Sequence, residues 1–298
     1  MGITLALVAM VCFAANIFIA RAAMTRMPLE PGFVVLLGVN VVFTAAALGV
    51  EWLLRATPFV FHWKGAAWFV LSGVVGIFFG RRMLLDTIRT LGPARASILH
   101  SSSPVFTLAV AWFLVGEHLG AYELGLVALV IAGLWTTQMP SDGEPGEHRP
   151  SREALRRGAI LGLLLVVGFG TGNAIRGLAM RTWNEAIFGS LLGTAAALLC
   201  QFASMRNWPK TFSDLRRSDR KGLALFAASG VATACGSMLT TYSMDYIEIA
   251  IATLITFTSP LVVFPVSVFV FRNREGLTPR TAGGAAMVLA GIVLLALR

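Results

Sequence analysis

The chain has 298 residues, of which 56% are hydrophobic and 13% are charged, whereas soluble proteins average roughly 45–50% apolar and about 25% charged residues. So few charges could not cover the surface of a soluble globule, which excludes a secreted disulfide scaffold, a disordered chain and a soluble nucleic-acid binder. The net charge of +9 does not indicate nucleic acid, because the basic residues lie mainly in short segments between apolar runs.

Ten apolar runs follow one another along the chain, each near the ~20 residues that a helix needs to cross the hydrocarbon core. They do not alternate in polarity as membrane strands do, so we expect an all-α polytopic membrane protein. The first run is not expected to be a signal peptide, because the first basic residue is Arg21. The expected spans are 3–22, 32–54, 66–88, 94–115, 121–139, 158–178, 186–205, 222–243, 247–271 and 280–297.

A polar segment, 140–157, divides the chain and is expected to be a linker, because it is rich in proline, glycine and charge. It separates a first repeat, 1–139, from a second repeat, 158–298. Five short matches recur between the halves at offsets of 156 to 158 residues, which indicates a duplication. They are Lys64-Gly65 with Lys221-Gly222, Ser72-Gly73-Val74 with Ser229-Gly230-Val231, Asn16 with Asn173, Ser103-Pro104 with Ser259-Pro260, and Ala132-Gly133 with Ala290-Gly291.

Each expected half holds five spans, an odd number, so the two halves should enter the membrane in opposite orientations. Inverted repeats of this kind are typical of secondary transporters, whose substrate site lies at the repeat interface near the bilayer midplane.

The stretch 92–136 carries the most specific pattern. Its features are the Ala-Arg-Ala-Ser run at 94–97, Ser103-Pro104, Gly116-Glu117 and Ala132-Gly133, repeated more loosely by Ala252-Thr253, Ser259-Pro260, Gly283 and Ala290-Gly291. This pattern resembles the EamA domain of the drug/metabolite transporter superfamily. The resemblance implies a carrier of small metabolites with ten helices, often an exporter, whose pathway lies between the repeats and is lined by helices 1, 3, 4, 6, 8 and 9.

Charged residues inside the expected spans are the sharpest sign of a site, because each costs at least ~2.5–3.5 kcal/mol in lipid and should face protein or water. At 100° per residue, Arg82 and Asp86 share one side of the third helix, with Gly73, Gly76 and Gly80 nearly opposite. The alternative is that the arginines reach the headgroups as the helix ends. The candidate substrate-binding residues are Asn16, Arg82, Asp86, Ser102, Asn173, Arg176 and Tyr242.

Two further groups have competing interpretations. His100 is interpreted as a packing residue or as a proton carrier, and the serines and threonines before Pro104 and Pro260 as kink support or substrate contacts. Glu117, with His118, is expected to cap the fourth helix and face a loop.

The chain lacks the common nucleotide-binding and hydrolase motifs, so transport would be driven by a gradient. We expect no catalytic residue, no metal and no cofactor. The expected partners are a small polar metabolite with a carboxylate, the lipid bilayer and a coupling proton, with the chain acting as a monomer in the inner membrane. A lipid-modifying membrane enzyme and a receptor or assembly protein remain as alternatives.

Orientation is open, because two arguments conflict. Seventeen basic residues lie in the odd-numbered connections and four in the even-numbered connections and the C-terminus. The positive-inside rule therefore places both termini outside, whereas the resembled family is commonly drawn with both termini inside. We favour the count, because basic residues follow the first helix and none precede it.

Overall fold

The computed structural model describes residues 1–55, 58–91, 99–138, 152–205, 208–259, 261–262 and 279–296. Within these ranges the regular elements are helices and no strand occurs. Six helices are long and apolar enough to cross a membrane, and three shorter apolar helices accompany them. The expectation of ten spans is therefore only partly confirmed, because much of the expected 247–271 span lies outside the described residues.

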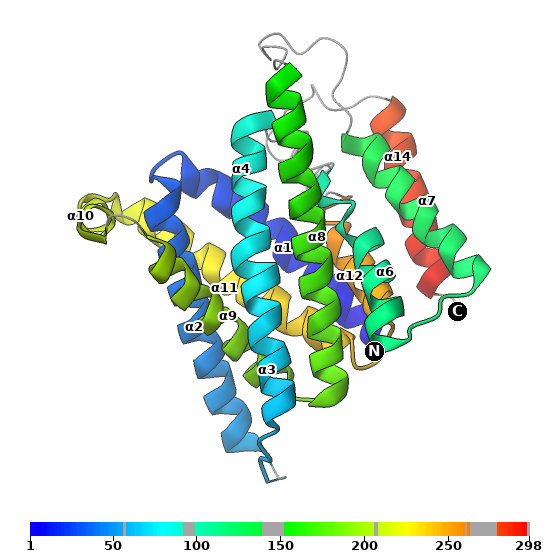
Figure 1. Ribbon diagram of the computed structural model, residues 1–298, viewed down its shortest axis with the longest axis horizontal. Coiled ribbons are helices and arrows are strands. Elements are labelled where there is room, and N and C mark those ends of the chain that lie inside the picture. Colours follow the sequence, from blue (N-terminus) through cyan, green and yellow to red (C-terminus); the bar gives the residue numbers. More distant parts are fainter. Residues whose placement is uncertain are drawn as a thin grey trace.

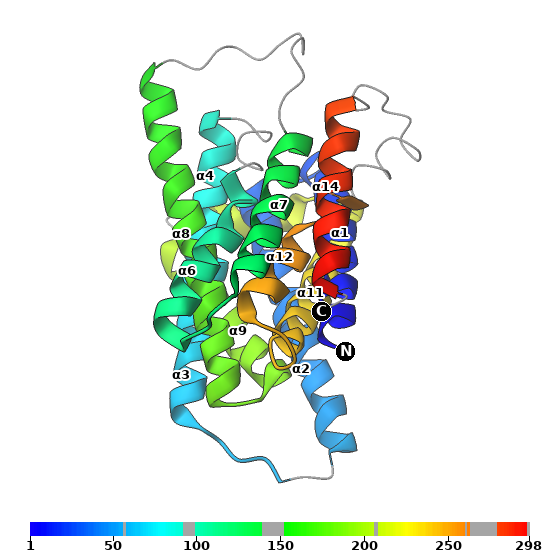
Figure 2. The same ribbon diagram turned by 90° about the vertical axis from the view of Figure 1, so that its right-hand side faces the viewer.

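The helices form one bundle, shown from two sides in Figures 1 and 2. Both termini lie in its lower half, at the end where α2 gives way to α3 (Figure 2). In chain order the elements are α1 (Gly2–Met24), α2 (Leu29–Leu54), α3 (Trp63–Ser72), η1 (Gly73–Gly80), α4 (Arg81–Leu91), α6 (Ser103–Val115), α7 (Ala121–Gln138), α8 (Arg152–Thr182), α9 (Ala186–Ser204), α10 (Trp208–Arg217), α11 (Arg220–Ser243), α12 (Ile249–Phe257) and α14 (Pro279–Ala296).

The third expected span is longer and less regular than the sequence suggested. Helices α3, η1 and α4 follow one another without a break from Trp63 to Leu91, and η1 is a π-helix. A π-helix bonds each residue to the fifth along the chain, so it turns less per residue than an α-helix. The 100° wheel that placed Arg82 opposite the glycines of η1 therefore does not hold through this segment.

The fourth expected span is interrupted by a turn, with residues 99 and 100 helical before it and residues 92–98 outside the described residues. Residues 101 and 102 form a turn, α6 starts at Ser103, and Pro104 lies in its first turn. Proline suits that position because the first amides of a helix have no partner inside the helix. Pro104 thus opens a helix rather than kinking one, which corrects the interpretation of this segment. Gly116 ends α6 with φ at 69°, the left-handed conformation that favours glycine.

The expected linker also ends earlier than predicted. Helix α8 starts at Arg152, so residues 152–157, which we assigned to the linker, are helical. Their sequence, Arg-Glu-Ala-Leu-Arg-Arg, is made of strong helix formers, and the last proline before it is Pro150. The preceding part of the linker, 139–151, lies outside the described residues.

Equivalent glycines of the two halves make equivalent contacts. A Cβ added to Gly32 in α2 would overlap the ring of Phe226 in α11, and one added to Gly189 in α9 would overlap the ring of Phe69 in α3. Residue 189 lies 157 positions after 32, and residue 226 lies 157 after 69. The two contacts are therefore equivalent: in one the glycine belongs to the first half and the phenylalanine to the second, and in the other these roles are reversed.

The Ser-Gly-Val matches follow the same rule. A Cβ on Gly230 would lie 2.7 Å from the backbone oxygen of Leu36, and one on Gly73 would overlap the backbone oxygen of Gly193. Both members shift by 157 positions again. Contacting residues in the two halves are thus related by the same offset as the sequence matches. The related contacts join α11 to α2 and η1 to α9.

Helices α7 and α14 end the two halves and pack against each other. A Cβ on Gly133 would meet Val288, and a Cβ on Gly291 would meet Val130, which is the same exchange at an offset of 158. The bundle core continues from this pair to α12, because Val130, Leu134, Leu254 and Val288 belong to one buried apolar cluster.

Candidate functional site

Side-chain hydrogen bonds between helices run through the middle of the bundle. Asn40 donates to Thr233 at 3.4 Å and joins α2 to α11, while Thr240 and Thr256 lie 3.3 Å apart and join α11 to α12. Neutral polar groups of this kind can stabilise helix contacts in lipid, where water is absent. Most of the neutral polar side chains in the core are therefore explained by packing.

The two equivalent asparagines have different surroundings. Asn16 in α1 accepts a hydrogen bond from the hydroxyl of Ser229 in α11. Asn173 is buried in α8, near Gly172, whose added Cβ would approach the backbone oxygen of Ser72. The structure thus gives Asn16 a packing role, and it leaves Asn173 as an interior candidate for substrate contact.

The arginine pair at the start of α4 divides between the interior and the surface. Arg81 is half-buried, and its guanidinium lies 5.5 Å from the centre of the Phe33 ring in α2. Arg82 is exposed and Asp86 is half-buried. We ranked Arg82 above Arg81 from the sequence, but Arg81 is the one that the structure places between helices.

Arg176 is a second interior guanidinium, half-buried in α8 one turn beyond Gly172. The ion pairs found among the described residues involve Arg26, Arg55 and Arg181, so neither Arg81 nor Arg176 meets a carboxylate within that part of the chain. Both therefore meet the requirement for binding an anionic group from outside the protein.

His100 lies beside Arg81 at the start of the fourth helical segment, where the Arg81 charge acts on it. Its ring contacts Phe169 and Phe257, with centroids at 4.6 and 4.8 Å. Its Nε2 atom is buried without a hydrogen-bond partner in the described structure. The packing interpretation of His100 is supported by the rings, and the free nitrogen keeps the polar interpretation open.

Ser102 and Tyr242 are held by other side chains. Ser102 accepts a hydrogen bond from the indole of Trp135 at 3.1 Å. Tyr242 packs beside Trp183 in a cluster at the end of α11, and Glu51, Arg55 and Glu185 interact with it electrostatically. Tyr242 therefore belongs to a charged group near one end of the bundle, away from the middle.

This charged group closes what we call the Arg55 end of the bundle. Arg55 follows α2 and donates two hydrogen bonds to Glu185, the residue before α9. Glu185 is buried, and the pKa of Arg55 is raised by its hydrogen bonds to Glu185. The sequence analysis did not identify either residue. Their positions directly at the ends of two spans were the available signal.

Glu117 makes a second closure at the same end. Its side chain is 2% exposed and receives hydrogen bonds from Arg181, at the end of α8, and from the backbone N–H of Ile249 at 2.8 Å. Burial raises the pKa of Glu117, against the opposing effects of these donors. Glu117 therefore caps α12 in the other half of the chain, which corrects the expectation of a loop-facing cap on the fourth helix.

Aromatic side chains surround the Arg55 end. The Trp183 indole donates to the backbone oxygen of Val60 at 3.0 Å, and its ring lies against Phe59 and Phe188. Trp52 also stacks on Phe188. These contacts tie the 58–62 connection to the turn between α8 and α9, so the ends of four helices are joined at one place.

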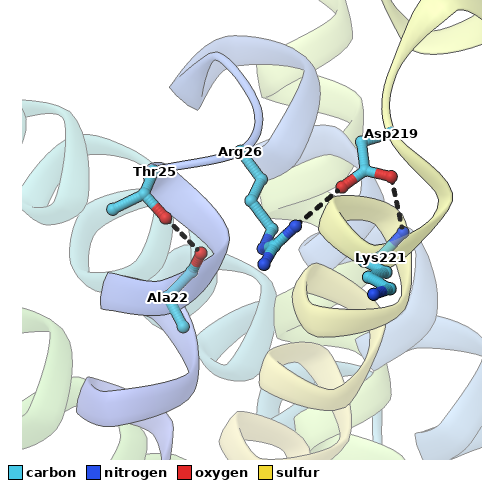
Figure 3. Close-up of polar contacts among 5 residues, drawn as sticks. All are labelled: Ala22, Thr25, Arg26, Asp219 and Lys221. Atoms are coloured by element: carbon cyan, nitrogen blue, oxygen red, sulfur yellow. Dashed lines mark hydrogen bonds and ion pairs between the residues drawn. The ribbon is translucent and has the colours of Figure 1, made fainter.

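The opposite end, which we call the Asp219 end, is more lightly joined. Asp219 precedes α11, accepts from the backbone N–H of Lys221 at 3.2 Å and pairs with Arg26 at 3.2 Å (Figure 3). Both members of the pair are almost half-exposed, and exposed ion pairs contribute little to stability. Among the described residues, the ion pair at the Asp219 end is thus more exposed than the ion pairs at the Arg55 end.

No group of three or more metal-ligating side chains occurs among the described residues. The candidate site thus consists of two guanidiniums, Arg81 and Arg176, inside a helical bundle, and buried ion pairs close one end of this bundle. Such a site can bind and release an anion without forming or breaking covalent bonds.

Comparison with known proteins identifies the family and the fold. The model of the EamA-like transporter family matches residues 1–138 and 156–297. A search of curated proteins gave no match. The fold is similar to that in a crystal structure of a protein with 16% sequence identity and a TM-score of 0.75, covering 99% of this chain and 98% of that chain. The two family matches cover nearly the whole sequence, one in each half, and this transmembrane chain therefore belongs to the EamA-like transporter family.

Proposed function

We propose that the protein is a gradient-driven exporter of a small polar metabolite that carries a carboxylate, such as an amino acid. The observation that carries this proposal is the pair of interior guanidiniums, Arg81 and Arg176, which meet no carboxylate among the described residues. A guanidinium matches a carboxylate with two parallel hydrogen bonds. A substrate carboxylate would compensate the cost of keeping these charges inside the bundle.

The exchange of helix contacts between the halves supports alternating access. Gly32 on Phe226 and Gly189 on Phe69 are the same contact made twice, so the two halves are related by a pseudo-symmetry, and we propose that exchanging the conformations of the halves gives a second state of the carrier. Helices α1 and α8, which begin the two halves, run in opposite directions (Figure 1), as an inverted repeat requires. We propose that the substrate site opens in turn to each end as one half rocks against the other.

The closures favour a state that is shut at the Arg55 end. Breaking Arg55–Glu185 and Glu117–Arg181 would leave two buried carboxylates without their cations, which is costly. Among the described residues, the ion pair at the Asp219 end is exposed instead. We propose that the structure represents the carrier before the Arg55 end opens.

A proton at Glu117 is our proposed coupling event. Because burial raises the pKa of this carboxyl, it takes up a proton at a higher pH than an exposed glutamate does. The proton therefore binds more tightly to the closed state, in which the carboxyl is buried, than to a state in which it is exposed, so protonation favours the closure and deprotonation favours opening. A proton gradient would then bias which end is open.

The proposed setting follows from the charge count. Seventeen basic residues on the side of the Asp219 end favour a cytoplasmic location for that end of a multi-pass inner-membrane protein. We propose that the chain works as a monomer, because both halves of the pathway are present in one chain. A lipid-modifying enzyme would need a cluster of acid, base or metal-ligating groups at one interface, whereas the buried carboxylates Glu117 and Glu185 at the Arg55 end are engaged as ion pairs.

Binding of small carboxylates to the purified protein tests the substrate class. We expect carboxylates to raise the thermal unfolding temperature, since a ligand that binds only the folded state stabilises it. Their amides and esters should not. Arg176→Ala should abolish the shift, and Arg280→Ala, an exposed arginine in α14, should retain it. Equal stabilisation by acids and amides would contradict the proposal.

A further inference from the structure

Helix α10 is a short helix without buried residues that runs in a different direction from most of the other helices. It has ten residues, Trp208–Arg217, with the sequence WPKTFSDLRR, and none of them is buried. Figure 1 shows it end-on at the edge of the bundle, while most of the other helices run along the bundle. It joins the membrane-spanning helices α9 and α11, so it must lie close to one membrane surface.

The apolar side chains of α10 lie on one side. Trp208, Phe212 and Leu215 are spaced i, i+4 and i+7, which places them on one face of a helix. Leu215 turns inward and packs against a cluster at the ends of α1 and α2 that includes Met27 and Phe33. Trp208 and Phe212 remain 45% and 41% exposed, so part of this face is uncovered.

Contacts at both ends fix the direction of this face. The Trp208 ring stacks on Phe202 at the end of α9, with centroids 5.2 Å apart, and on Phe212 at 6.2 Å. At the other end, Asp219 pairs with Arg26 near the end of α1 (Figure 3). The helix is thus held against the bundle before any other molecule binds.

The other side of α10 is basic. Arg216 and Arg217 are exposed, and Arg220 and Lys221 follow within one turn, also exposed. Two acids lie close to them along the chain, Asp214 in α10 and Asp219, which is already engaged with Arg26 and the Lys221 amide, so the basic residues outnumber the acids. A positive surface therefore adjoins an exposed aromatic pair at the level where a membrane surface must lie.

We propose that α10 is an interfacial helix that binds the headgroups of anionic phospholipids. Trp208 and Phe212 lie at the boundary between headgroups and acyl chains, where amphipathic helices place their aromatic residues. Arg216, Arg217, Arg220 and Lys221 bind phosphate groups of the same leaflet, because anionic lipids attract basic segments next to a membrane span. The occupant is lipid rather than a protein, because the aromatic face continues directly from Phe202 on the membrane helix α9.

Hydrogen–deuterium exchange of the full-length protein tests this inference. The protein is placed in nanodiscs of phosphatidylcholine alone or of phosphatidylcholine mixed with phosphatidylglycerol, and the backbone exchange of residues 208–217 is measured. We expect exchange to slow several-fold in the anionic discs, and added salt to reverse the effect. The double variant Arg216→Gln/Arg217→Gln should remove most of the lipid dependence, whereas Arg280→Gln should keep it.

The aromatic pair gives a second readout. Trp208→Ala/Phe212→Ala should speed exchange of α10 in both kinds of disc, because the apolar anchor is lost while the charges remain. Equal hydrogen–deuterium exchange rates of residues 208–217 in the two kinds of nanodisc would overturn the proposal. So would protection that appears only after a soluble cell extract is added, since that would make the occupant a protein.

Discussion

Replacing Gly230 with alanine tests the helix contact on which the exchange of the two halves rests. The new Cβ would lie 2.7 Å from the backbone oxygen of Leu36 and 3.0 Å from the Cβ of Val39, whereas ordinary contact begins near 3.4 Å. Helices α11 and α2 would have to move apart. Overpacking of this kind costs about 1–3 kcal/mol, and the better helix propensity of alanine returns up to about 1 kcal/mol. We expect a net loss of about 1–2 kcal/mol.

Gly38→Ala is the matched control, because Gly38 lies in α2 and a Cβ there meets nothing within 4 Å. It should be neutral or stabilise the protein by up to about 1 kcal/mol. Thermal unfolding of the detergent-purified variants measures both. Gly73→Ala, the repeat equivalent, should destabilise in the same direction as Gly230→Ala. If Gly230→Ala unfolds at the same temperature as Gly38→Ala, the close contact of α11 with α2 is refuted.

Three further predictions concern charged residues. Arg81→Ala should abolish transport in vesicles without loss of folded protein, and Arg81→Lys should restore little because the planar fork is absent, whereas Arg82→Ala changes an exposed residue and should transport normally; normal transport by Arg81→Ala would remove Arg81 from the site. Glu117→Ala should destabilise the protein by about 2 kcal/mol, because the α12 cap and the partner of Arg181 are lost. The unfolding free energy of the wild type should fall as the pH rises from the ordinary carboxyl pKa through the raised pKa of Glu117, and Glu117→Gln should lose this fall; unfolding measured on both sides of that range checks both. The pKa of Asp219 is lowered, mostly by the hydrogen bond from the Lys221 amide. The ionised carboxylate therefore stabilises the wild type slightly above the ordinary carboxyl pKa, and this stabilisation is lost as the pH falls through the lowered pKa. Asp219→Asn should lack it, and acid unfolding curves identical to those of the wild type would contradict this.

The repeat was the part of the fold that the sequence predicted best. A constant offset between short matches is a property of the chain itself, and the same offset recurs in contacts such as Gly230 on Leu36. Span positions were also close, because lipid imposes a length on each helix. The break at residues 101–102 was not predicted, because apolar content does not reveal such a turn inside a span.

The candidate site was harder to predict, because side-chain direction depends on helix geometry. The π-helical segment η1 changes the phase between Gly73 and Arg81, and a regular helical wheel cannot anticipate it. Glu117, Arg55 and Glu185 lie near span ends, where the sequence suggests solvent exposure. Their partners come from segments 64 and 130 residues away, so only the tertiary structure shows that these charges are paired.

Transport by the purified protein in sealed proteoliposomes tests the central claim most directly. Radiolabelled amino acids and simple carboxylates are loaded inside, a pH difference is imposed, and efflux is followed for the wild type and Arg176→Ala. The account predicts that a carboxylate leaves faster with the pH gradient than without it, and that Arg176→Ala abolishes this efflux while remaining folded. Efflux by Arg176→Ala equal to that of the wild type would contradict the account.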